Sequence, residues 1–242
     1  MAHDYRIKKL ALKVEYPPTL RVYSRMDDVA IKLASYFPDW ERGAVAIELR
    51  NWDRRHTFKM LHKESLFLCD DPPVLNDDVR LGIHCLEAAL KRFDCNRNLT
   101  ASVGIHFVSG IDTEFDQLVH AMDAKFHVPQ GSIPAFNGFT LLDTSYTIEL
   151  KDDGHTGWTR KITAGPMTRT EWLSKNSLTV RISHLTGEEM DRHKQSVPPV
   201  FVFLALDSTR AGMGLRETID MLPQIVQSTT EMANSFMAYC KD

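Results

Sequence analysis

The 242-residue chain contains 43% apolar and 25% charged residues, which are ordinary proportions for a soluble globular protein. Its formal net charge of −3 argues against a protein whose main work is to hold nucleic acid, because such domains are usually strongly basic. We expect no membrane association, since no stretch approaches the roughly 20 apolar residues that cross a bilayer.

The first half of the chain predicts the element order β–α–β–β–β–α. Strands are indicated by alternating apolar residues, and helices by apolar residues at a spacing of three or four. The second helix of this half has a good N-cap in Asn76. The expected elements are a strand at 5–14, a helix at 26–37, strands at 44–49, 57–62 and 65–68, and a helix at 76–95.

The second half repeats this order of elements. A strand and a helix come first, hairpin-linked strands follow, and a long helix ends the chain. The expected elements are a strand at 102–108, a helix at 113–126, strands at 139–150, 157–162, 178–183 and 200–207, and a helix at 215–239. The repeat lies in element order and not in residue identity.

This order predicts an α+β fold built from two β-α-(β)3-4-α units, residues 1–98 and residues 99–242. We expect their strands to join into one curved antiparallel sheet that helices cover on one face. No Pro/Gly/Ser-rich linker separates the halves, so we expect one compact unit with a long C-terminal helix.

The stretch LDSTRAGMGLRETI at 206–219 resembles a phosphate-binding turn, because Gly212 and Gly214 follow an apolar strand. A dinucleotide fingerprint needs a small residue three positions after the second glycine, where this chain has Glu217. The stretch is interpreted as a strand-to-helix connection, and no nucleotide cofactor is expected.

One helical face carries a possible set of metal ligands. Asp116, His120, Asp123 and His127 are separated by four, three and four residues, so they line the same face of the predicted helix. The opposite stripe is apolar, and any amphipathic helix shows such polar residues to water. The prediction is therefore no metal and no cofactor.

The sequence identifies no catalytic residues. It contains neither an H-E-x-x-H motif nor a recognisable nucleophile elbow. Because catalytic triads assemble from residues far apart in the chain, enzymatic activity stays open, with a non-enzyme favoured.

The hairpin at 50–63 is the best candidate for binding an anion or a nucleic acid. Its basic and aromatic residues are Arg50, Trp52, Arg54, Arg55 and Lys59. Charges that project from one hairpin beside an aromatic ring suit a nucleic-acid platform. The alternative is a solvated hairpin face, which the acidic net charge favours.

A small-ligand pocket between sheet and helices is a further hypothesis. Its candidate residues are His106 and Asp207, which lie in the predicted central strands. Buried groups with shifted titration would support this hypothesis, because perturbed pKa values gather at functional sites.

The four cysteines, Cys69, Cys85, Cys95 and Cys240, are scattered and form no C-x-x-C pair. No disulfide framework is expected, which favours a reducing compartment. The N-terminal segment MAHDYRIKKL has no apolar stretch typical of a secretory signal. We therefore expect a cytoplasmic protein.

Several structural motifs resemble those of sporadically distributed bacterial proteins of unknown function. They are Tyr16-Pro-Pro, Tyr36-Phe-Pro38, Trp52 before an aromatic-containing strand, the helix 81–93, Ser102-Val-Gly-Ile-His-Phe-Val with Ile111 after it, Leu204-Ala-Leu-Asp207, and Phe236 in the last helix. Such relatives have an asparagine after the central strand, where this chain has Ser109. The resemblance spans most of the chain and implies no activity.

The duplicated arrangement is also similar to the TATA-binding-protein fold. This likeness concerns the fold alone, and fold does not imply function. The aromatic wedges and strong positive charge of DNA-bending members have no counterparts that match residue by residue.

Three functions follow as hypotheses. The first is a non-catalytic binding or accessory protein of the bacterial cytosol that works through its sheet surface or its last helix. Its partner would be a second copy of the chain, as in the common homodimer, or another protein. The second is a nucleic-acid-binding module that uses the hairpin at 50–63. The third is a small-ligand receptor or enzyme.

Overall fold

The computed structural model describes residues 5–127, 141–151, 157–176, 187–188, 191 and 195–241. The described elements of the first half follow the predicted order, with one additional strand, β2, after the first helix. They are β1 (Tyr5–Glu15), α1 (Leu20–Leu33), β2 (Asp39–Arg42), β3 (Ala46–Asn51), β4 (His56–Leu61), β5 (Glu64–Asp70) and α2 (Leu75–Phe93).

The described elements of the second half are similar in order. They are β6 (Leu99–Gly110), α3 (Phe115–Phe126), β7 (Tyr146–Lys151), β8 (Thr159–Thr168), α4 (Arg169–Asn176), β9 (Val200–Met213) and α6 (Leu215–Lys241). None of the helices in the described ranges is long and apolar enough to cross a membrane.

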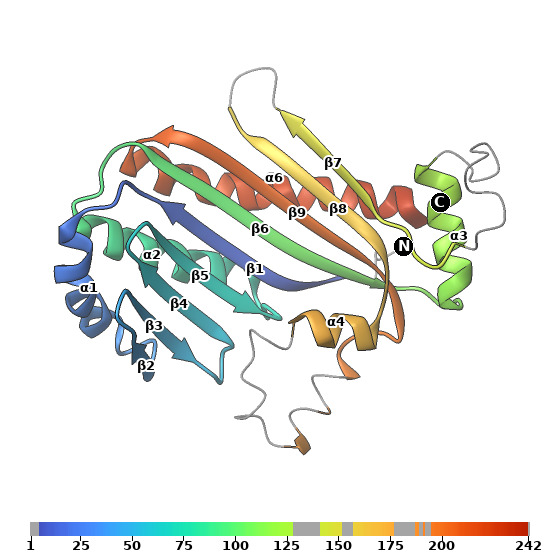
Figure 1. Ribbon diagram of the computed structural model, residues 1–242, viewed down its shortest axis with the longest axis horizontal. Helices are drawn as coiled ribbons and strands as arrows, with labels where there is room; N and C mark the ends of the chain where they lie inside the picture. The colour runs from blue at the N-terminus through green and yellow to red at the C-terminus, as the bar shows by residue number, and fades with distance from the viewer. Residues whose placement is uncertain are drawn as a thin grey trace.

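All these strands form one nine-stranded sheet in the order β2-β3-β4-β5-β1-β6-β9-β8-β7, and neighbouring strands pair antiparallel. The first strand of each half, β1 or β6, lies at the centre of the sheet. The last strand of each half, β5 or β9, lies directly outside it. This arrangement confirms the predicted α+β fold with one antiparallel sheet, and Figure 1 shows the curved sheet with the long helix α6 behind it.

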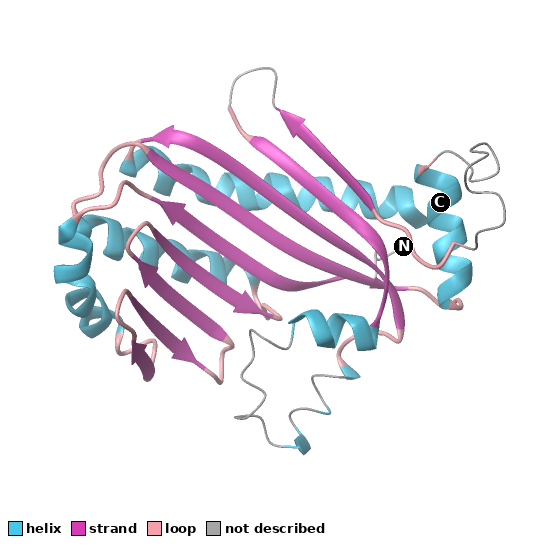
Figure 2. Ribbon diagram, in the orientation of Figure 1, coloured by secondary structure: helices cyan, strands magenta, loops and turns pink. Residues whose placement is uncertain are grey.

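The core lies between the sheet and helices α1, α2 and α6, on the far side of the sheet in Figure 2. The alternation along β1 explains this placement: Leu10 and Leu12 are fully buried, whereas Lys9 and Lys13 are partly exposed. Successive side chains of a strand point to opposite faces, so the apolar set faces the helices. The largest fully buried side chains of this kind include Trp158, Phe37, Phe58, Phe67, Phe93 and Phe107.

Helix α2 packs very closely against the sheet at Gly82. A Cβ atom at this position would lie 2.6 Å from Cδ1 of Phe67 and 2.7 Å from Cδ1 of Leu12. The helix ends at Phe93, and Asp94 caps its C-terminus in a left-handed conformation (φ 59°). A glycine in the middle of a helix costs stability, and here it permits close helix–sheet contact.

The opposite face of the sheet carries a second, smaller apolar cluster. Trp172 of α4 packs here on the sheet with Val108, Met167 and Phe201. Of the helices that the structure describes, α4 is the one that rests on this face, near one end of β6, β8 and β9. The rest of the described open face has no helical cover.

Three elements differ from the sequence-based expectation. Helix α1 begins at Leu20 and not at residue 26, because buried Val22 already belongs to its apolar stripe. The edge strand β2 was not predicted, since all its residues are exposed and give no burial pattern. Helix α4 was also not predicted.

Other expected elements are confirmed with shifted ends. Strand β9 extends to Met213, so Gly214 alone connects it to α6. Gly212, which has a φ of 77°, lies inside β9, where the pairing with β6 shifts register. Pro223 lies inside α6, so this helix has already begun before the proline. The strand expected at 178–183 lies outside the described residues.

Candidate functional sites: the open sheet face and a buried His–Cys–Asp cluster

The open sheet face, defined as the face opposite α1, α2 and α6, carries rows of polar side chains across the central strands. Directly paired residues of neighbouring strands point to the same face. One such row contains Ala11, Gly104, Asp207 and Lys161 on β1, β6, β9 and β8. The next row places Lys9 opposite His106, and a third places Lys13 opposite Ser102.

His106 is packed between aromatic rings on this face. Its ring makes edge contacts with Phe203 (centroids 5.4 Å apart) and with Trp172 of α4 (6.4 Å). Burial lowers the pKa of His106 to about 4, and the nearby charge of Lys9 adds to the effect. Its Nδ1 atom is buried and has no hydrogen-bond partner among the described residues. His106 is therefore a neutral imidazole at physiological pH.

Asp207 lies on the next strand, where its side chain reaches solvent. Oδ1 lies 2.8 Å from the position that a Cβ atom of Gly104 would take, so the missing side chain makes room for the carboxylate. Loss of hydration raises the pKa of Asp207, while Lys161 and Lys13 act in the opposite direction. The carboxylate and the two lysines form a mixed-charge centre on the open face.

A small-ligand pocket at His106 and Asp207 stays a prediction; of the two, His106 lies between the sheet and a helix, because Trp172 of α4 packs against it. Both residues face away from α1, α2 and α6. The reason is the alternation of β6 and β9: Ile105, Phe107 and Leu206 take the helix-facing positions.

Carboxylates from neighbouring parts of the chain engage most of the basic residues of the hairpin at 50–63. Arg50 donates hydrogen bonds to Glu48 (2.7 Å) and Glu41 (3.0 Å), and its guanidinium lies 5.6 Å from the ring centroid of Trp52. Lys59 lies 3.7 Å from Glu48 as well.

The other two arginines of the hairpin differ from each other. Arg55, at the turn (φ 56°), pairs with Asp71 at 2.5 Å. Arg54 is exposed, and its backbone N–H donates to Asn51. Nucleic-acid binding by this hairpin stays a prediction, and the carboxylate contacts leave less positive charge for it than the sequence indicates.

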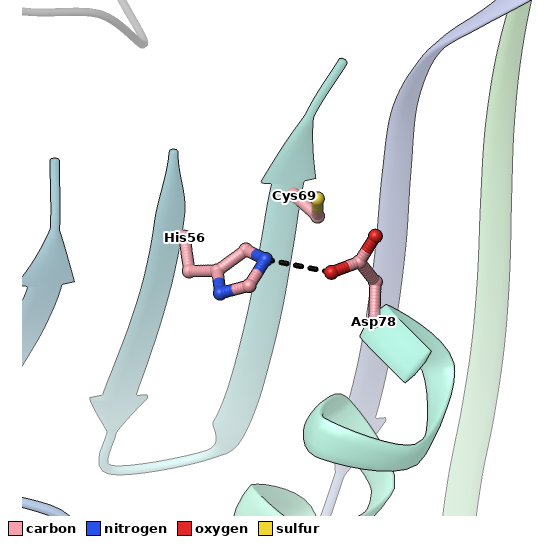
Figure 3. A group of neighbouring side chains, drawn as sticks. All are labelled: His56, Cys69 and Asp78. Atoms are coloured by element: carbon pink, nitrogen blue, oxygen red, sulfur yellow. Dashed lines mark hydrogen bonds and ion pairs between the residues drawn. The ribbon is translucent and has the colours of Figure 1, made fainter. Parts of the chain in front are cut away.

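The structure also brings together three residues to which the sequence assigned no common role. His56 begins β4, and Cys69 lies directly opposite it on β5. Asp78 lies in the first turn of α2 and reaches both (Figure 3). The His56 Nε2 and Asp78 Oδ1 atoms are 2.9 Å apart, and one ligand atom from each of the three residues lies within 4.8 Å of the others.

The His56–Cys69–Asp78 cluster is buried on the helix side of the sheet. The side chains of His56 and Asp78 are 4% and 8% exposed, and Cys69 is fully buried. Burial lowers the pKa of His56, although Asp78 partly opposes this. Burial also raises the pKa of the Cys69 thiol, and the negative charges of Asp78 and Asp70 add to it. Oδ2 of Asp78 has no hydrogen-bond partner in the described chain.

Two sequence signals could have pointed to the cluster. Cys69 occupies an inward position of an alternating strand, and Asp78 is a carboxylate in the first turn of an amphipathic helix. The register that places His56 opposite Cys69 has no counterpart in local sequence patterns.

The polar helix face at 116–127 is separate from this cluster. His127 contacts Asp123 at 3.2 Å and Thr144 at 3.0 Å, whereas Asp116 and His120 are exposed. Among the described residues, the group whose ligand atoms converge is His56, Cys69 and Asp78.

The chain matches no protein-family model and none of the curated proteins with which it was compared.

Proposed function

We propose that this protein is a non-catalytic binding protein of the bacterial cytosol that holds a protein partner on its open sheet face. The observation that carries the proposal is the unequal covering of the sheet. Helices α1, α2 and α6 bury one face, while the described part of the other face has α4 at one end as its helical cover. The long central strands, on which α4 is the one described helix that rests at this face, offer a broad, rigid surface.

The chemistry of the open sheet face favours a protein partner over a nucleic acid. Cationic Lys9 and Lys161 alternate with anionic Glu64 and Asp207, which gives no continuous positive track for a phosphate backbone. Leu66 on β5 is partly exposed on this face. Mixed charges with apolar contacts are typical of protein–protein interfaces.

The partner is a second copy of this chain or a different protein. Cyclic dimers are the commonest oligomers of soluble proteins, which favours the homodimer. The cytosolic setting is supported by the thiols of Cys69, Cys85 and Cys95, which are buried and free. Secreted proteins tend instead to use their cysteines in disulfides.

Site-specific photo-crosslinking in the cells that make the protein tests this proposal. A photoreactive benzoylphenylalanine replaces Lys161, which is exposed on the open face. The matched control carries the same residue in place of Gln224, which is exposed on α6 at the covered side. We expect a discrete protein adduct from position 161 and a much weaker one, or none, from position 224.

The mass of the adduct separates a homodimer from a complex with another chain. The charge reversal Asp207→Lys should lower the yield of the position-161 adduct at least several-fold while leaving the thermal unfolding midpoint unchanged. Equal adducts from both positions, no adduct from either, or a nucleic-acid adduct would each contradict the proposal.

A further inference from the structure

We infer that His56, Cys69 and Asp78 are the protein ligands of a divalent transition-metal ion of the zinc class. The three side chains offer an imidazole nitrogen, a sulfur and a carboxylate oxygen, and their ligand atoms converge within 4.8 Å. Zinc is commonly bound by this mixture of nitrogen, sulfur and oxygen donors. The sequence shows no motif for it, because the three residues come from two strands and a helix.

The separations suit an ion after small side-chain movements. With metal–nitrogen and metal–oxygen bonds of about 2.0 Å and a metal–sulfur bond of about 2.3 Å, tetrahedral ligand atoms lie roughly 3.3–3.6 Å apart. The His56 Nε2 and Asp78 Oδ1 atoms, 2.9 Å apart, need to separate slightly. Cys69 is carried by the strand paired to that of His56, so the backbone already places both donors on one side of the sheet.

An unused acceptor supports a ligand over a purely structural hydrogen bond. Oδ2 of Asp78 is buried and has no hydrogen-bond partner in the described residues. A buried carboxylate oxygen without a partner is costly, and a cation would satisfy it.

The proton balance of binding follows from the donors. The thiol of Cys69 gives up its proton to solvent and binds as a thiolate. The Nε2 atom of His56 binds through its lone pair, so its proton resides on Nδ1. The hydrogen bond between His56 and Asp78 is exchanged for two bonds to the ion. A fourth position is left for a small ligand such as water.

The bound ion would join the start of α2 to the paired strands β4 and β5. This side of the sheet is the helix-covered one, so the metal site does not depend on the open sheet face or on its partner. Loss of the metal and loss of partner binding are therefore separable.

Cobalt(II) and zinc(II) titrations of the purified, chelator-treated protein test the inference. Co²⁺ bound to a thiolate gives a near-ultraviolet charge-transfer band, which reports the Cys69 sulfur directly. We expect one equivalent of Co²⁺ to produce this band and one equivalent of Zn²⁺ to abolish it. Zn²⁺ should also raise the thermal unfolding midpoint, because a ligand that binds the folded state stabilises it.

A pair of cysteine variants provides the matched control. Cys69→Ala and Cys85→Ala each remove a fully buried thiol, but Cys85 lies outside the cluster. Only Cys69→Ala should lose the band. Loss of a residue that merely hydrogen-bonds to a metal ligand typically lowers metal affinity roughly 10- to 100-fold. Because Cys69→Ala removes a ligand itself, its Zn²⁺ affinity should fall by more than this.

Three results would overturn the inference. They are the absence of a charge-transfer band in the wild-type protein, a band that persists in Cys69→Ala, or a band that disappears equally in Cys85→Ala. The wild-type titration alone decides the matter if Cys69→Ala does not fold.

Discussion

His56 Nε2 lies 2.9 Å from Oδ1 of Asp78, and this buried contact joins the first residue of β4 to the first turn of α2. It ties together two elements that are separated by all of β5. The contact lies in the same layer as the apolar core, where each polar group needs a partner.

Removal of the Asp78 carboxylate should therefore destabilise the metal-free protein. We expect Asp78→Ala to lower the free energy of unfolding by about 1–3 kcal/mol, since it leaves the His56 imidazole buried without this partner. Urea unfolding in the presence of a chelator measures the change. The control Asp77→Ala removes the neighbouring exposed carboxylate, which pairs with Arg80, and should change stability by less than about 1 kcal/mol. Equal effects of the two variants would contradict the prediction.

Lys8 supplies a second test of buried polar contacts. It is 5% exposed, and its ammonium donates to Asp71 (2.6 Å) and to Ser196 (3.1 Å). Asp71→Asn should cost about 2–4 kcal/mol, because it takes the negative charge away from a buried ammonium. Asparagine tolerates the left-handed backbone at this position (φ 49°), so the loss is not a backbone effect.

Chemical denaturation compares this variant with Asp53→Asn, an exposed substitution in the hairpin turn. The prediction is wrong if Asp71→Asn is no more destabilising than this control. A stability that is independent of the charge at position 71 would mean that Ser196 alone satisfies Lys8.

His106 makes stability depend on pH. Its folded pKa of about 4 lies below the ordinary value of 6.5, so between these values the unfolded chain binds a proton that the folded chain does not. The contribution of neutral His106 to the free energy of unfolding is complete above pH 6.5. It is lost as the pH falls towards 4, and the free energy of unfolding then decreases by no more than about 1.4 kcal/mol per pH unit. His56 titrates in the same direction, because its pKa is also lowered.

The variant His106→Phe keeps the aromatic packing and removes the titrating group. We expect its unfolding midpoint to fall less than that of the wild type when denaturation is followed from pH 7 to pH 4. His120→Gln, at an exposed position of α3, should follow the wild-type curve. If the unfolding midpoints of all three proteins fell equally between pH 7 and pH 4, His106 would not be the source of the pH dependence.

Gly82 tests how closely α2 approaches the sheet. Gly82→Ala would place a methyl group 2.6 Å from Phe67 and 2.7 Å from Leu12. Overpacking of this kind lowers the free energy of unfolding by about 1–3 kcal/mol. The better helix propensity of alanine offsets up to about 1 kcal/mol of this loss. The net effect should be a lower thermal unfolding midpoint.

The same substitution at Gly43 provides a comparison, because an added Cβ there meets its nearest neighbour at 3.7 Å. Gly43→Ala should leave the midpoint nearly unchanged. If Gly82→Ala stabilised the protein instead, helix α2 would have to lie farther from β5 than the structure places it.

Much of the fold could be predicted from the sequence because its patterns are local. The alternation along β1, the helical spacing of α2 and the long apolar stripe of α6 each arise within one element. The order of elements then led to the prediction of one antiparallel sheet, which the structure confirms. Elements without such patterns were missed, as β2 shows: its four exposed residues carry no burial signal.

The candidate sites were much less predictable. The sequence suggested Arg50 as a residue that binds an anion or a nucleic acid, but folding brings the carboxylates of Glu41 and Glu48 to its guanidinium. His106 and Asp207 were identified correctly as central strand residues, but only the pairing of β6 with β9 shows that both side chains lie on the open sheet face.

The sequence by itself determined the order and type of most elements. Hydrophobic periodicity within a segment decides whether the segment buries one stripe of a helix or one face of a strand. The tertiary structure alone decided which polar residues meet. His56, Cys69 and Asp78 converge because strand register and helix docking bring them together, and both depend on packing between segments distant in the chain.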